Sequence, residues 1–311
     1  MESELPTVDL NKTFAQRFFA PLGIVLVTVT AAGIGWLVVG GLDRGQRALF
    51  VTGPAYALWR MMIGITVAVA VAGTVFIMPV LRELRARYPS ASLSALTALY
   101  LIAIAGTAAV PRLFWGRIEP STVRIGIALV LVAVAMWPAV AVIWVVRARV
   151  RFLAQQPVDS LVATTAYRIE EIRSLRAALI TALTILAMVV SISVLNTGQL
   201  RNARIAAGTA ADIPPTYALL YGAVLAGLLA VLFVPVHLSW QAAGTRILDA
   251  SYPIVRTDAA GDPRLPDDEW RAGRDRLTEL MGLANTATAQ FRAAFTTLAP
   301  FLTGLLAYFL K

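Results

Sequence analysis

Seven long stretches of this 311-residue chain contain no Asp, Glu, Lys or Arg. They are residues 19–41, 61–81, 91–110, 125–146, 177–195, 217–240 and 293–310. A transmembrane helix needs about 20 consecutive, mostly apolar residues, so each stretch is long enough or nearly long enough to cross a bilayer. We therefore predict an all-α fold, a polytopic transmembrane helical bundle of about seven helices.

The pattern within the runs favours helices over strands. Residues 125–135 are apolar at every position or Gly, whereas the strands of a membrane barrel alternate apolar and polar side chains. A helix also pairs its backbone groups within one segment, which hydrocarbon requires. The last run is the weakest, because it is short and contains Pro300. If residues 293–311 re-enter or lie in the interface, the bundle has six spans.

Composition excludes several classes of site. The chain is 58% hydrophobic and 14% charged, whereas soluble domains are about 45–50% apolar and about 25% charged. It has no cysteine and one histidine, His237, so disulfides, thiolate catalysis and His-rich or Cys-rich metal sites are excluded. No Gly-rich phosphate loop, Ser nucleophile elbow or HExxH motif is present. We predict no enzymatic activity, no cofactor and no bound metal.

Basic residues indicate orientation and origin. If the N-terminus is cytoplasmic, 18 of the 27 Lys and Arg residues lie on the cytoplasmic side, including the clusters 82–87 and 147–151. Excess positive charge marks cytoplasmic loops, so we predict a cytoplasmic N-terminus and no nucleic-acid partner. Only Lys12 and Lys311 are lysines. With the abundance of Ala and Val, this bias suggests a GC-rich bacterial genome and the bacterial inner membrane.

The segments outside the runs define the remaining organisation. Residues 1–18 form a cytoplasmic N-terminal segment, and 19–243 form a six-helix core. Within that core we predict an amphipathic cytoplasmic helix in 147–176, with Glu170, Glu171 and Arg173 off its apolar stripe. This helix either extends the bundle, packs on a partner or lies along the membrane.

Residues 244–292 should form a cytoplasmic loop followed by a helix. The helix should begin near Asp267, because carboxylates are favoured in a first helical turn. Trp270, Leu277, Leu280 and Met281 should line one face, with Ala284.

No Asp, Glu, Lys or Arg lies within a span, and His237, at the inner end of the sixth run, is the nearest ionisable candidate for a functional role. Uncharged polar residues are the remaining site candidates. Thr66 and Thr74 lie in the second span, and Thr184 and Ser191 lie seven residues apart on one face of the fifth. Such hydroxyls either line a pore or bond to neighbouring helices and their own backbone. Small residues four apart, such as Ala31 and Gly35, predict close helix packing. The first span has the pair Ala31 and Gly35, the second has Gly64, Ala68 and Ala72, and the sixth has Gly222 and Ala226.

Three function classes remain open. The sequence favours a non-enzymatic membrane protein that acts through partners as a structural, assembly or signalling component. A homo-oligomeric channel or membrane-permeabilising effector is the close alternative, because a pore lined by hydroxyls needs no charge in the bilayer. A coupled transporter or intramembrane enzyme ranks lowest, because such proteins use ionisable residues within their spans. The expected partners are the bilayer and either identical chains or other subunits.

Overall fold

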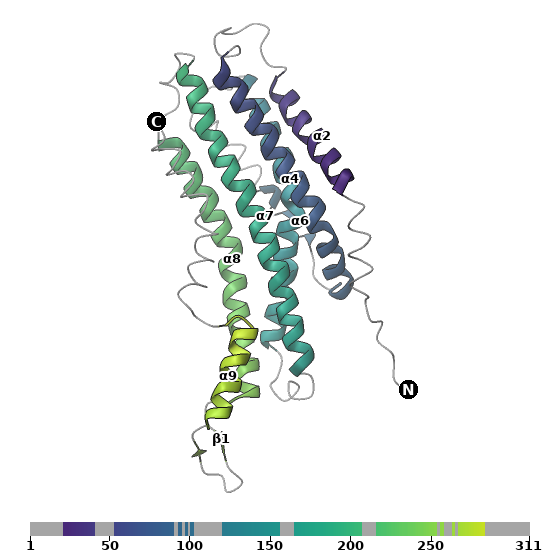
Figure 1. Ribbon diagram of the computed structural model, residues 1–311, viewed down its shortest axis with the longest axis vertical. Helices are drawn as coiled ribbons and strands as arrows, with labels where there is room; N and C mark the ends of the chain where they lie inside the picture. The colour runs from purple at the N-terminus through teal and green to yellow at the C-terminus, as the bar shows by residue number, and fades with distance from the viewer. Residues whose placement is uncertain are drawn as a thin grey trace.

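The structure is a computed structural model that describes residues 21–40, 53–89, 93–94, 97–98, 100–102, 120–155, 165–206, 216–253, 256–257, 263–264 and 267–283. Long helices dominate it (Figure 1). They are α2 (Pro21–Gly40), α4 (Pro54–Arg87), α6 (Pro120–Gln155), α7 (Thr165–Ala206) and α8 (Thr216–Ser251), followed by the shorter α9 (Asp268–Leu280). The two-residue strands β1 (Arg256–Thr257) and β2 (Pro263–Arg264) pair antiparallel between α8 and α9.

The helical prediction is confirmed for most of the expected spans. Four helices are long and apolar enough to cross a membrane: α4, α6, α7 and α8. They contain the predicted runs 61–81, 125–146, 177–195 and 217–240, and α2 coincides with the first run as a shorter apolar helix. Most of the run 91–110 and all of 293–310 lie outside the described residues, as does the segment 1–18.

The long helices lie side by side (Figure 1). The helices α4, α6 and α8 run in one direction, and α2 and α7 run in the other. The central helix α4 packs against α2, α6 and α7, while α8 packs against α6 and α7. Their buried faces form one apolar core, in which Ile77, Ile143, Ile172 and Leu175 are among the most deeply buried side chains.

Small residues bring α2 and α4 into close contact. A Cβ atom added to Gly64 would lie 2.9 Å from the carbonyl oxygen of Ala32, and one added to Gly35 would lie 3.1 Å from the Cα of Gly64. Real side chains do not approach a backbone this closely, so only Gly fits at position 64 without a shift. The close packing predicted from the small residues therefore occurs between α2 and α4 of a single chain.

We expect Gly64→Ala to lower the free energy of unfolding by about 1–3 kcal/mol, because the added methyl group must push α2 away from α4. Gly33→Ala is the matched control on α2, because nothing lies within 4 Å of its new Cβ. That control should be neutral or stabilising, since Ala favours a helix over Gly by about 1 kcal/mol. Equal effects of the two substitutions on unfolding in mixed micelles would contradict the close contact.

The helices at one end of the bundle extend well beyond the apolar runs. At 1.5 Å per residue, the 42 residues of α7 measure about 63 Å, which is twice the roughly 30 Å of a bilayer core. The segment 147–176 was predicted as one amphipathic helix, and the structure corrects this. Its first part continues α6 to Gln155, and its last part begins α7 at Thr165. In the described part of the apolar stripe, Ile172 and Leu175 are buried and belong to the bundle core.

The region after the sixth run follows the prediction in part. Residues 244–251, the start of the predicted loop-and-helix segment 244–292, are the last turns of α8. The predicted helix start is confirmed, since the Asp267 carboxylate caps α9 by accepting a hydrogen bond of 2.8 Å from the backbone N–H of Trp270. Leu280 was predicted to share one face with Leu277 and Met281, but its side chain is 50% exposed whereas Met281 is 1% exposed. A helix turns by about 100° per residue, so Leu280 and Met281 lie on either side of Leu277 around the helix axis.

Candidate functional site: a polar cluster at the basic end

The charged residues of the described chain are unevenly divided between the two ends of the bundle. One end of the bundle, which we name the basic end, is formed by the last turns of α4, α6 and α8, the first turns of α7, and the β1–β2–α9 region. It carries 15 of the 19 described arginines and all nine described carboxylates. The other four arginines lie at the opposite end, at positions 60, 124, 201 and 204. Every described ion pair lies at the basic end.

A buried carboxylate joins three helices at this end. Glu171, near the start of α7, is only 6% exposed. Its Oε1 accepts a hydrogen bond of 2.7 Å from the hydroxyl of Tyr88, which follows α4. The same oxygen accepts from the Nε of Arg149 on α6, at 2.5 Å. The cluster therefore fixes the ends of α4, α6 and α7 relative to one another.

Aromatic rings surround the arginine of this cluster. The guanidinium carbon of Arg149 lies 4.8 Å from the centre of the Tyr88 ring and 5.1 Å from that of Phe152. A cation over an aromatic face is attracted by the ring quadrupole, so these contacts supplement the ion pair. The second carboxylate oxygen of Glu171, Oε2, is buried and has no hydrogen-bond partner among the described residues. A buried polar atom of this kind is a usual position for an ordered water.

Sequence reasoning missed this cluster. Glu171 was placed off the apolar stripe, and the structure corrects this, because its side chain faces the core beside Ile172. The partners Tyr88 and Arg149 are 83 and 22 residues away in the chain. No local pattern connects them. Only the packing of α4 and α6 against α7 reveals why one of two adjacent glutamates is buried.

The Tyr88 hydroxyl makes the stability of the folded protein depend on pH. Burial, followed by its hydrogen bond to the charged Glu171, raises the pKa of Tyr88 well above its usual value. Because the folded pKa is the higher one, the contribution of Tyr88 to stability is complete below a pH of about 10, the unfolded value. It is lost as the pH rises through the folded pKa.

We therefore expect the wild type to lose more stability than Tyr88→Phe between pH 9 and pH 12, values set by the ordinary tyrosine pKa of about 10. Below that range the wild type should be the more stable of the two, because it keeps the hydrogen bond to Glu171. Unfolding in mixed micelles across this range provides the measurement. A constant difference between the two proteins would contradict the raised pKa.

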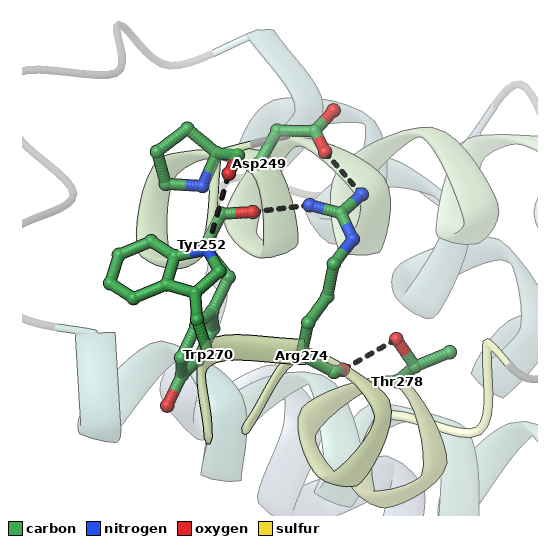
Figure 2. A network of polar contacts seen from close by, with 6 residues as sticks. Asp249, Tyr252, Trp270, Arg274 and Thr278 are labelled. Carbon is green, nitrogen blue, oxygen red and sulfur yellow. Dashed lines mark hydrogen bonds and ion pairs between the residues drawn. The ribbon is translucent and has the colours of Figure 1, made fainter. Parts of the chain in front are cut away.

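A second polar network holds α9 against the end of α8 (Figure 2). The guanidinium of Arg274 donates to Asp249 at 2.7 Å and also to the carbonyl oxygen of Tyr252. The Trp270 indole N–H donates to the carbonyl oxygen of Pro253 at 3.2 Å, and its ring meets the Tyr252 ring edge-on with centroids 5.0 Å apart. These contacts dock α9 firmly onto the bundle.

Two of the predicted hydroxyls are bonded within the bundle. Thr66 is buried and donates to the carbonyl oxygen of Met62, one turn earlier on α4, at 2.8 Å. Thr74 donates to Ala70 in the same way at 3.0 Å, and also to the carbonyl oxygen of Ala135 on α6. These two hydroxyls therefore act as helix contacts in this structure, which is one of the two roles that the sequence left open.

The other two hydroxyls lie differently. Thr184 is exposed on α7, on the same face as the exposed Ile180 and Met188. Ser191, about two turns beyond Thr184, is half-buried. Neither hydroxyl bonds to a residue that the structure describes. The structure thus does not bring Thr184 and Ser191 together with Thr66 and Thr74 in one described path.

His237 lies in an aromatic row on α8. Its ring stacks on Phe233 with centroids 5.2 Å apart and meets Trp240 at 5.8 Å. The Trp240 ring in turn faces the guanidinium of Arg176 on α7, at 5.4 Å. The sequence singled out His237, but its spatial neighbour Arg176 comes from another helix.

No group of three or more metal-binding side chains occurs within the described ranges. No protein family model, curated protein or solved structure matches this chain.

Proposed function

We propose that this chain is a seven-span, non-enzymatic protein of the bacterial plasma membrane that acts through partner proteins bound at its cytoplasmic, basic end. The proposal involves no cofactor. It has three parts, which are the span count, the orientation and the mode of action.

The direction of the helices supports a third span between α4 and α6. The end of α4 meets α6 near Arg149, because Tyr88 and Arg149 share Glu171. Pro120, where α6 begins, is about 44 Å away at 1.5 Å per residue. The chain from Tyr88 to Pro120 must therefore return along the bundle. Tyr100 lies partway along this return, since its hydroxyl donates to the carbonyl oxygen of Ala133 in the middle of α6.

The arginine distribution supports a cytoplasmic basic end. Fifteen described arginines lie at that end and four at the other. The orientation rule weighs Lys and Arg near the span ends and gives little weight to carboxylates, so the nine acidic residues do not cancel it. With seven spans, the N-terminus lies in the cytoplasm and residue 311 lies outside.

The main support for action through partners is the packed extension at the basic end. It consists of the last turns of α6, the first turns of α7, and α9. The α6–α7 extension and α9 hold their positions through Glu171 and Arg274, two networks that a simple membrane anchor does not require. Large side chains are exposed there, including Phe152, Tyr167 and Leu280. A packed surface that exposes aromatic and aliphatic side chains among arginines has a composition typical of protein interfaces.

One observation favours the alternative of a homo-oligomeric pore. Thr184 and Ser191 lie on a helix face with hydroxyls that no described residue satisfies. A hydroxyl facing hydrocarbon without a partner is unfavourable, whereas a second copy of α7 or a water-filled path satisfies it. This alternative does not need the extension at the basic end.

The mass of the purified protein in mild detergent, together with ion flux after reconstitution in liposomes, distinguishes the two. The partner-dependent protein should be a monomer alone, should form a complex of fixed stoichiometry in its own membrane, and should conduct no ions. A closed ring of identical chains with flux would overturn the proposal and support the pore. In that case Thr184→Val together with Ser191→Ala should change the flux, whereas Thr66→Val should not.

A further inference from the structure

Three unusual side chains meet where α7 and α8 leave the apolar part of the bundle at the basic end. Arg176 directly precedes the charge-free run 177–195, and Trp240 is the last residue of the run 217–240. The guanidinium carbon lies 5.4 Å from the centre of the Trp240 ring, and the His237 ring lies 5.8 Å from the same ring.

Two side chains of this group have no acceptor in the part of the chain that the structure describes. Among the described residues, Arg176 is half-buried yet forms neither an ion pair nor a hydrogen bond, in contrast to Arg149 and Arg274. Trp240 is 6% exposed, and its indole N–H is buried without a hydrogen-bond partner. Burying a donor or a charge without a partner is costly. The buried indole N–H and the unpaired guanidinium beside it indicate that an acceptor from outside the chain belongs there.

The end of α9 keeps this position open for the arginine. Gly282 follows α9 with a φ of +63°, a backbone conformation that favours glycine. A Cβ atom at this position would overlap the guanidinium of Arg176. The adjacent Leu283 packs against Gly244 of α8, so the turn is held in place. Glycine at position 282 therefore serves both the turn and the space that Arg176 occupies.

We propose that Arg176, Trp240 and His237 bind a phosphate group at the basic boundary of the bundle. A guanidinium binds two phosphate oxygens in parallel, and it remains charged at any physiological pH. The indole N–H can only donate, and a neutral imidazole offers one further N–H. Three donors and no carboxylate suit a ligand with several acceptor oxygens. The inference is independent of the proposed partner function.

The depth of the site favours a lipid headgroup as the source of the phosphate. Trp240 marks the end of an apolar run, and tryptophans concentrate at the level of the headgroups. Basic pockets between transmembrane helices on the cytoplasmic side bind anionic lipid headgroups. Free phosphate or a soluble phosphate ester presents the same chemistry, so the experiment includes both sources.

The test uses the full chain, delipidated in a neutral detergent, with binding measured by native mass spectrometry and by thermal stabilisation. The probes are phosphatidylglycerol, phosphatidylcholine with the same acyl chains, and inorganic phosphate. We expect saturable binding of phosphatidylglycerol, weakened at least about tenfold by Arg176→Gln, which removes a charge-assisted hydrogen bond. Trp240→Phe keeps the ring and removes only the N–H, so we expect a weakening of about threefold.

Arg173→Gln is the matched control, because Arg173 lies one turn earlier on α7, is exposed and pairs loosely with Glu170 at 3.9 Å. It should bind phosphatidylglycerol as the wild type does. Competition by inorganic phosphate at the same site supports the phosphate site and assigns it to a soluble source, while binding of the lipid alone assigns it to the headgroup. If Arg176→Gln fails to fold, the binding of phosphatidylglycerol by Trp240→Phe tests the proposal instead. Unchanged binding in folded Trp240→Phe, or equal losses in the Arg173 control, would overturn the proposal.

Discussion

Glu171→Gln should lower the free energy of unfolding by about 3 kcal/mol, because removing one partner of a buried ion pair leaves the other charge uncompensated. The side chain of Glu171 is almost completely buried, and its Oε1 serves both Arg149 and Tyr88. A neutral amide keeps the shape of the side chain but removes the charge that the guanidinium requires. The midpoint of unfolding in mixed micelles measures the effect.

The neighbouring residue provides the control for this experiment. Glu170 is exposed, and its pairing with Arg173 at 3.9 Å is loose. Glu170→Gln should therefore change the free energy of unfolding by less than about 1 kcal/mol, as exposed ion pairs do. If the two glutamines have equal effects, Glu171 is not the centre of a buried cluster.

A double substitution separates charge from packing. In Arg149→Met with Glu171→Met, no charge remains without a partner, and apolar side chains of similar size fill the space. Such replacements of buried ion pairs are often neutral or stabilising, so the double variant should be more stable than Glu171→Gln. The packed extension at the basic end should then be retained, so that partner binding can be tested apart from the ion pair.

Single cysteines at the two ends of the bundle should react from opposite sides of the membrane. The chain has no cysteine, so each introduced thiol is the only one present. Asn202 on α7 and Gln155 on α6 are exposed, uncharged positions at the far end and the basic end. With a membrane-impermeant maleimide, Asn202→Cys should be labelled in intact spheroplasts. Gln155→Cys should be labelled only after the membrane is permeabilised.

The outcome is all or none because a charged reagent does not cross the hydrocarbon core. Each signal is normalised to labelling of the denatured protein, which removes differences in thiol reactivity. The reverse pattern would invert the proposed orientation. Labelling of both positions from one side would contradict the proposal that α6 and α7 span the membrane.

Two features of the protein follow from the sequence by itself. The charge-free runs determine that the chain forms long apolar helices, because a run of about 20 residues without charge has no other way to satisfy its backbone in hydrocarbon. The start of α9 at Asp267 also follows locally, because a cap depends only on residues within one turn. Small residues four apart also indicated that Gly64 packs closely against another helix. They did not indicate that this helix is α2.

Other features were decided only by the tertiary structure. Glu170 and Glu171 are adjacent and chemically identical, yet one is exposed and the other is buried between Tyr88 and Arg149. The sequence made Thr74 a candidate for a polar path, but in the structure its hydroxyl donates to the carbonyl oxygen of Ala135 on α6. Arg176 became a candidate ligand-binding residue only because α8 places Trp240 against it and α9 ends in Gly282 beside it. In each case the deciding contact joins residues distant in sequence, and the energy of a buried polar group depends on which neighbours the packing brings to it.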